Sequence, residues 1–199
     1  MRALDFVRRS SDGAREGLCY ANFALNDELY RPDTSGRPHI RLRLAERLKD
    51  APWVTLDVSQ EQRSAPDEML RYYAQLVRHK FVLSPQGRGI DCCRTWESLY
   101  LGAIPVVVES APMSAFRDLP ILFTDDYGEL SEEYLERRWR EMSSRSFEIE
   151  LLLKSWYSRR FLEAVATLRK PRFVCLWDDP ARSPASVERA LRSALCADL

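Results

Sequence analysis

The segment 87–97 combines glycines with charged side chains in a spacing that suits an anionic ligand. Gly87 and Gly89 permit a sharp turn in which the backbone can approach a phosphate closely. Arg94 offers a planar guanidinium that binds phosphate oxygens in pairs, and Glu97 offers a carboxylate that accepts hydrogen bonds from sugar hydroxyls. These residue types indicate a phosphate-bearing ligand, with Arg94 on the diphosphate and Glu97 on the ribose of a nucleotide.

A strand, a turn and a helix must position these side chains, and the sequence predicts them in that order. The apolar run 81–83 is typical of a buried strand, and Asp91 is a favourable N-cap for the helix that follows the glycine loop. The packed face of that helix is expected to carry Cys92, Trp96, Leu99 and Tyr100. Ligands bind outside the carboxyl ends of parallel strands, where helix N-termini present unpaired N–H groups, so we expect the site at this junction.

Two other interpretations of the same residues remain open. Arg94 and Glu97 stand three residues apart and would, as a surface ion pair, contribute only about 0.3 kcal/mol. Gly87 and Gly89 also match the start of a dinucleotide fingerprint, in which Glu109 would be the ribose-binding acid. Cys92 then occupies the position where a third glycine allows close helix–strand packing, which counts against an NAD site.

Glu109 and Ser110 end the next apolar run and are further candidates. They are expected at the same carboxyl edge of the sheet as the glycine loop, where their side chains could contact the sugar or the phosphates. Both residues could equally be polar only because the end of the strand is exposed to water.

Strand-like and helix-like patterns alternate along the chain, which predicts an α/β fold. We expect a Rossmann-like, mostly parallel sheet of about six strands with helices on both faces. The expected strands are 18–25, 53–58, 80–84, 104–109, 121–124 and 173–177. The expected helices are 39–49, 68–77, the one that follows the glycine loop, 131–142, 147–168 and 186–195. We expect a flexible segment over 1–16, a Rossmann-like ligand-binding domain over 17–142, and C-terminal helices with the final strand, 143–199, packing on the same domain.

Composition excludes several classes of function. The 199 residues include 30 Lys and Arg against 30 Asp and Glu, so the chain lacks the positive charge that general nucleic-acid binding requires. No apolar run is long enough for a membrane span or a signal peptide, so we expect a soluble or cytoplasmic protein, or a Golgi location if this is a fragment of a longer chain. The five cysteines show no zinc-ligand spacing, and adjacent aspartates are more typical of turns, so no metal site is assigned.

A larger pattern surrounds the candidate site. It comprises Ser84-Pro85, Gly87, Gly89, Asp91, Arg94, Trp96-Glu97 and the segment 102–107, with weaker extension over 18–140. This pattern resembles the exostosin-like glycosyltransferases, which have the GT-B architecture of two Rossmann domains.

The resemblance implies a role for each part of the site. The chain would be the donor-binding C-terminal domain and would hold a nucleotide-diphosphate sugar, UDP-linked, without a metal or another cofactor. Glu97 would bind the ribose, and Arg94 and Arg88 would face the diphosphate, whose developing charge is stabilised by fixed positive groups. Cys93 stands where relatives often carry histidine. The expected substrate-binding residues are Gly87, Arg88, Gly89, Asp91, Arg94, Glu97, Glu109 and Ser110.

The implied reaction is transfer of a hexosyl or pentosyl group to a hydroxyl acceptor, a glycan or another molecule. The general base of such enzymes is usually supplied by the acceptor-binding domain, and few residues precede the first expected strand here. We therefore assign no catalytic residue and expect a partner chain to supply that domain. Two alternatives remain: a non-catalytic nucleotide-sugar-binding domain or subunit, and an NAD-dependent oxidoreductase.

Overall fold

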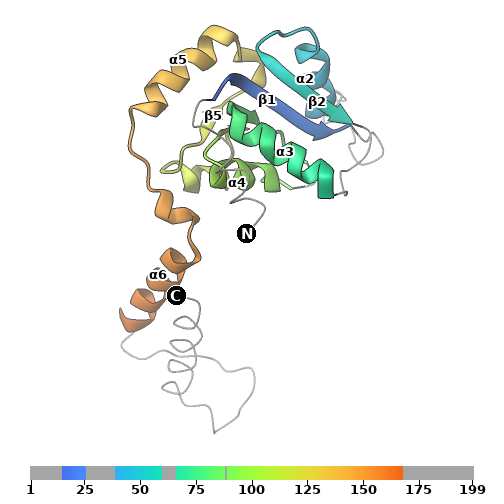
Figure 1. Ribbon diagram of the computed structural model, residues 1–199. Helices are drawn as coiled ribbons and strands as arrows, with labels where there is room; N and C mark the ends of the chain where they lie inside the picture. The colour runs from blue at the N-terminus through green and yellow to red at the C-terminus, as the bar shows by residue number, and fades with distance from the viewer. Residues whose placement is uncertain (1–14, 26–38, 60–65, 88, 168–199) are drawn as a thin grey trace. The chain divides into compact units, whose positions relative to one another are not determined.

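Five strands lie parallel in a single sheet, in the order β2-β1-β3-β4-β5 (Figure 1). This computed structural model describes residues 15–25, 39–59, 66–87 and 89–167. The strands are β1 (Gly17–Ala24), β2 (Val54–Ser59), β3 (His79–Leu83), β4 (Ile104–Val108) and β5 (Leu122–Thr124). The predicted α/β, Rossmann-like class is confirmed, with five strands in the described part of the chain rather than about six. The expected strand 173–177 and helix 186–195 lie outside that part.

Four α-helices accompany the sheet in the described part of the first unit. They are α2 (Ile40–Leu48), α3 (Pro66–Arg78), α4 (Cys93–Tyr100) and α5 (Glu132–Ser143), with 3-10 turns η2 (Met113–Phe116) and η3 (Tyr127–Glu129). Ser131, the first residue of the expected helix 131–142, is the N-cap of α5, and its hydroxyl accepts from the Tyr134 amide at 3.2 Å. His39 is the N-cap of α2, and its Nδ1 accepts from the Arg41 amide at 3.3 Å.

Alternate side chains of β1 point to opposite faces of the sheet, so the sheet has two cores. Cys19, Ala21 and Phe23 belong to the core covered by α2 and α5. Tyr20 faces the other core, which α3 covers. Figure 1 shows α3 and α4 together in front of the sheet. The crossover helices thus occupy both faces, as the alternating pattern predicts.

Not every apolar side chain of α3 is buried. Leu70 fits the apolar spacing of the sequence, yet its side chain is exposed. Tyr72, Leu76 and Val77 are the buried side chains of this helix. The buried position of Tyr72 matters for the site described below.

Gly102 ends α4 in a left-handed conformation, with φ of 76°. Its amide donates to the Leu99 carbonyl at 3.0 Å, and the Ala103 amide donates to the Ser98 carbonyl at 2.8 Å. This pair of bonds is the Schellman arrangement, which favours glycine because other side chains are strained at positive φ. The glycine before the apolar run 104–108 therefore sets the length of α4.

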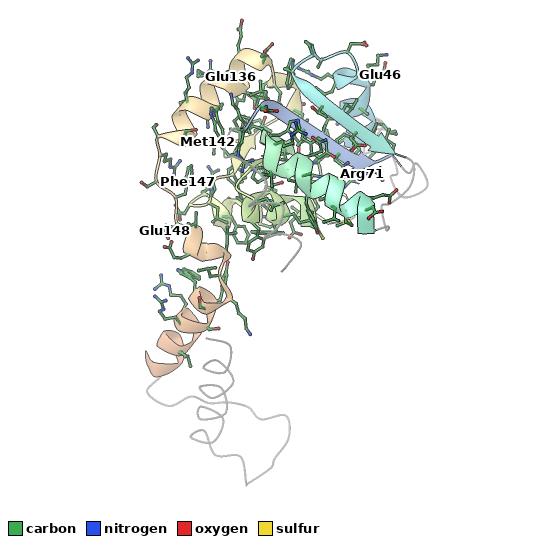
Figure 2. All side chains as sticks on the ribbon, viewed as in Figure 1. Glu46, Arg71, Glu136, Met142, Phe147 and Glu148 are labelled. Atoms are coloured by element: carbon green, nitrogen blue, oxygen red, sulfur yellow. The ribbon has the colours of Figure 1, made fainter. Side chains whose placement is uncertain are left out.

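A boundary at Phe147 and Glu148, both labelled in Figure 2, separates two compact units of the chain, 1–147 and 148–199. The described part of the second unit contains η4 (Ile149–Leu152) and α6 (Lys154–Thr167). The single helix predicted over 147–168 is therefore wrong, because Leu153 is extended between these elements, with φ of −95° and ψ of 132°. The predicted packing of segment 143–199 on the same domain stays a prediction. Among the described helices, none has the length and apolarity that a bilayer crossing requires.

The two histidines of the chain should make the fold sensitive to mild acid. Burial lowers the pKa of His79, whose Nδ1 lies 2.8 Å from the Gln75 carbonyl and whose Nε2 lies 2.8 Å from the Thr55 hydroxyl. The His79 side chain is buried. Burial also lowers the pKa of His39, with the charges of Arg41 and Arg43 adding to the effect.

A lowered pKa in the folded state means that the unfolded chain binds more protons, so stability falls as the pH drops below about 6.5, the ordinary histidine value. We expect the urea midpoint to be lower at pH 5.5 than at pH 7.5. The double variant His39→Asn, His79→Gln should lose most of this difference, because asparagine keeps the N-cap without titrating. An equal pH dependence in the double variant would assign the effect to other groups.

Candidate functional site

The carboxyl ends of β1 and β3 form the switch point of the sheet. β2 lies on one side of β1, whereas β3, β4 and β5 follow on the other side. Loops that leave neighbouring strands in opposite directions open a crevice at such a point, where open α/β sheets bind ligands. The loop 84–87 leaves β3 at this edge, and α4 begins soon after it.

Three small polar side chains join the end of β3 to the start of α4. The Ser84 hydroxyl lies 2.9 Å from the Cys92 sulfur and 2.8 Å from the Thr95 hydroxyl. Ser84 and Thr95 are both buried. These bonds give the two buried hydroxyl groups hydrogen-bond partners in place of water. They also hold the first turn of α4 against the sheet.

The buried face of α4 corrects the sequence prediction. It consists of Thr95, Ser98 and Leu99, whereas Tyr100 is exposed. The hydroxyls are tolerated because each has a hydrogen-bond partner: the Thr95 hydroxyl lies 2.8 Å from the Ser84 hydroxyl, and Ser98 donates to the Arg94 carbonyl at 2.6 Å. Small side chains on this face let the helix lie close to the sheet.

The N-cap of α4 is Cys92, not Asp91 as predicted, and no side chain caps the helix. Asp91 lies one residue too early to reach the first amides, and its carboxylate instead accepts from the Trp96 indole at 3.1 Å. The N-terminal amides of α4 therefore lack a side-chain acceptor at the edge where an anion is expected.

Arg94 and Glu97 contact different partners. Arg94 Nη1 lies 3.5 Å from the Cys92 sulfur, and Arg94 Nε is buried without a hydrogen-bond partner. Glu97 Oε2 accepts from the Tyr72 hydroxyl at 2.7 Å. Within the ranges that the structure describes, no ion pair joins Arg94 to Glu97. The surface ion pair considered above therefore does not form.

Arg41 is a buried arginine of this region that the sequence analysis did not single out. Its side chain is 7% exposed; Nε donates to the Gln86 carbonyl at 3.0 Å and Nη2 to the Pro85 carbonyl at 3.3 Å. A signal was present, because Arg41 falls on the same helical stripe as the buried Leu44 and Leu48. Arg41 shapes the loop 84–87 and brings positive charge to the carboxyl edge.

Tyr127 and Tyr72 were also missed. Tyr127 is buried in η3, and its hydroxyl donates to the Val106 carbonyl at 3.3 Å. Burial raises its pKa, with further contributions from the charges of Cys92 and Arg94. The spacing of Tyr72 and Leu76 on α3 indicates that Tyr72 is buried, but only tertiary packing decides that its hydroxyl reaches Glu97.

The other predicted site residues are less closely associated with α4. Glu109 forms an ion pair with Arg117, whose guanidinium lies over the Phe123 ring at 5.4 Å. The Ser110 hydroxyl oxygen is buried without a partner. In the loop, the Gly87 amide donates to the Gly89 carbonyl at 3.3 Å, and Arg88 lies outside the described residues.

In the described part of the chain, no group of three or more His, Cys, Asp or Glu side chains is placed to hold a metal ion. Comparison with known proteins finds no family model and no curated protein that matches the chain.

Proposed function

We propose that the carboxyl edge of β3 binds the nucleoside diphosphate of a nucleotide sugar, and that the chain is the donor-binding part of a glycosyltransferase. One observation carries the proposal: Arg94 and Glu97 stand one turn apart on α4, with opposite charges, and do not pair. Each side chain keeps hydrogen-bonding capacity for a ligand that has both anionic and hydroxyl groups.

The diphosphate part of the proposal rests on charge and on backbone donors. Arg94 lies in the first turn of α4, whose amides have no side-chain cap, and Arg41 is buried behind the loop 84–87. The positive end of the helix dipole adds to these two guanidinium groups. Together, the two guanidinium groups and the α4 N-terminus favour an anionic ligand, either a single phosphate or a diphosphate.

The ribose part rests on Glu97. An ionised carboxylate has about four lone-pair positions, of which the Tyr72 hydroxyl occupies one. The remaining positions suit two neighbouring hydroxyl groups of a sugar. The same side chain offers nothing to a plain inorganic anion, so Glu97 favours a nucleotide over free phosphate.

In the proposed reaction, the bond between the anomeric carbon and the diphosphate oxygen breaks, and a bond forms between that carbon and the acceptor oxygen. The acceptor proton passes to a general base, and the diphosphate leaves with both electrons of the broken bond. Arg94 and the α4 amides would stabilise the negative charge that develops on the leaving group. The base is expected from an acceptor-binding domain.

Calorimetric titration of the full chain with UDP, GDP, NAD and UDP-sugars, with and without Mg²⁺, tests the proposal. We expect UDP to bind, and Glu97→Gln to weaken binding about tenfold, or about 1.4 kcal/mol, because an amide cannot accept from two hydroxyls as a carboxylate does. Glu133→Gln is the matched control: Glu133 is exposed on α5, and its loss should change nothing. Absence of nucleotide binding in the wild-type chain would refute the proposed site.

The same titration, followed by an assay for released UDP and glycosylated acceptor, separates the alternatives. An NAD-dependent enzyme would bind NAD and lose it on Glu109→Gln; the ion pair of Glu109 with Arg117 disfavours this role. A binding subunit would bind a UDP-sugar but release no UDP from it when acceptors are offered. Release of UDP together with a glycosylated acceptor would establish the transferase.

A further inference from the structure

Among the described residues, Tyr72 makes the one hydrogen bond that holds the Glu97 carboxylate. Tyr72 lies on α3, Glu97 lies on α4, and the phenol oxygen is 2.7 Å from Glu97 Oε2. Among the contacts of the described residues, Glu97 Oε1 has no partner. One carboxylate oxygen is thus anchored by the fold, and the other is open to a ligand.

Packing leaves the Tyr72 ring little freedom. Its side chain is 6% exposed and belongs to the core between α3 and the sheet. The ring lies 6.3 Å from Tyr20 and 5.4 Å from Tyr73, measured between centroids. A hydrogen bond from so constrained a ring fixes the direction of the carboxylate that accepts it.

The direction of this hydrogen bond is also determined. A carboxylate only accepts, so the phenol must donate its single proton to Glu97. Burial raises the pKa of Tyr72 well above its ordinary value, so the phenol keeps that proton at neutral pH. Tyr72 therefore acts as a permanent donor.

The alternative partner of Glu97 is Arg94. An arginine and a glutamate three residues apart on a helix are within reach of each other, and such pairs form readily when nothing competes. Here the Tyr72 hydroxyl takes Glu97 Oε2 while Arg94 turns toward the Cys92 sulfur. Without the phenol, the ion pair would consume both groups that the proposed ligand needs.

Building on the proposed function, we propose that Tyr72 is a positioning residue that keeps Glu97 apart from Arg94 and thereby makes the site selective for ribose over deoxyribose. The open oxygen and the remaining lone pair of Glu97 accept the two neighbouring ribose hydroxyls. A 2′-deoxynucleotide fills only one of these positions and leaves the other without its donor. The preference for ribose therefore depends on the orientation of the Glu97 carboxylate, which the hydrogen bond from Tyr72 fixes.

The test compares UDP with 2′-deoxy-UDP as calorimetric ligands of the full chain. The wild-type chain should prefer UDP by about tenfold. Tyr72→Phe keeps the ring and removes only the donor; the preference should fall to less than about threefold, and UDP affinity should fall about tenfold. Tyr73→Phe is the matched control, because Tyr73 is the adjacent residue on the same helix and its hydroxyl makes no hydrogen bond within the described residues.

A merely structural role for Tyr72 would weaken both ligands equally and leave their ratio unchanged, which would overturn the inference. A second measurement adds Arg94→Gln to Tyr72→Phe. Removing the competing guanidinium should restore part of the preference for UDP while affinity for both ligands stays low; no recovery would also count against the inference. If the wild-type chain binds neither nucleotide, the proposed function itself fails, and this result is distinct from a failure of the Tyr72 variants.

Discussion

Replacing Arg15 by methionine is expected to lower the free energy of unfolding by about 3 to 5 kcal/mol. The guanidinium donates to four backbone carbonyls: Leu76 at 3.0 Å, Val77 at 2.9 Å, His79 at 2.7 Å and Leu101 at 2.7 Å. These carbonyls belong to the last turn of α3, the start of β3 and the C-cap of α4. Methionine fills the space of the stem but leaves the carbonyls without a charged donor. Equilibrium unfolding in urea measures the loss.

Arg78→Met is the control for Arg15. Arg78 pairs with Glu16 at 3.3 Å, but its side chain is 61% exposed, so the pair should contribute less than about 1 kcal/mol. Arg15→Lys should fall between the two, since an ammonium keeps the charge but cannot span four carbonyls. Equal effects of the two methionine variants would show that the buried hydrogen bonds contribute no more than a surface pair.

Arg15 also bears on the proposed site. It links the end of α3, the helix of Tyr72, to the end of α4, the helix of Glu97. Loss of the link is expected to loosen the alignment of the two helices. The Arg15 variants should therefore show weaker discrimination between UDP and 2′-deoxy-UDP even at temperatures where the chain stays folded.

Replacing Gly17 by alanine should destabilise the fold by about 2 to 3 kcal/mol. Gly17 lies directly opposite His79 in the pairing of β1 with β3, and a Cβ at Gly17 would stand 2.2 Å from His79 Cδ2. The imidazole cannot move aside easily, because it stacks on Tyr20 with centroids 5.3 Å apart and is hydrogen-bonded at both nitrogens. A shift of the ring would break bonds to Gln75 or Thr55.

Gly128→Ala provides the comparison for Gly17. A Cβ at Gly128 would meet only side-chain atoms, Asp126 Oδ1 at 3.1 Å and Arg47 Nη1 at 3.3 Å, at an exposed turn. Its cost should stay below about 1 kcal/mol. In a His79→Ala background, Gly17→Ala should hardly change the free energy of unfolding, because the imidazole atoms that the new Cβ would meet are absent. An unchanged loss of stability in that background would exclude the steric explanation.

Local sequence patterns predicted most elements of the fold. The apolar runs matched β1 to β5 within one residue at each end, and Ser131 and His39 proved to be N-caps. Such features depend on residues a few positions apart, which the sequence displays directly. The N-cap of α4 was predicted wrongly. Asp91 is a good capping residue by type, but the N-cap is Cys92, one residue later, because the Ser84 hydroxyl at the end of β3 contacts the Cys92 sulfur.

The sequence by itself therefore determined the α/β class, the succession of strands and helices, and the position of Arg94 and Glu97 near the carboxyl end of a central strand. Only the tertiary structure decided the strand order β2-β1-β3-β4-β5, the burial of Arg41, and the partners of Arg94 and Glu97. Tyr72 reaches Glu97 across 25 residues, and Arg15 reaches Leu101 across 86. Hydrophobic periodicity reports which face of an element is buried, but the partner of a polar group depends on which elements become neighbours in the folded sheet.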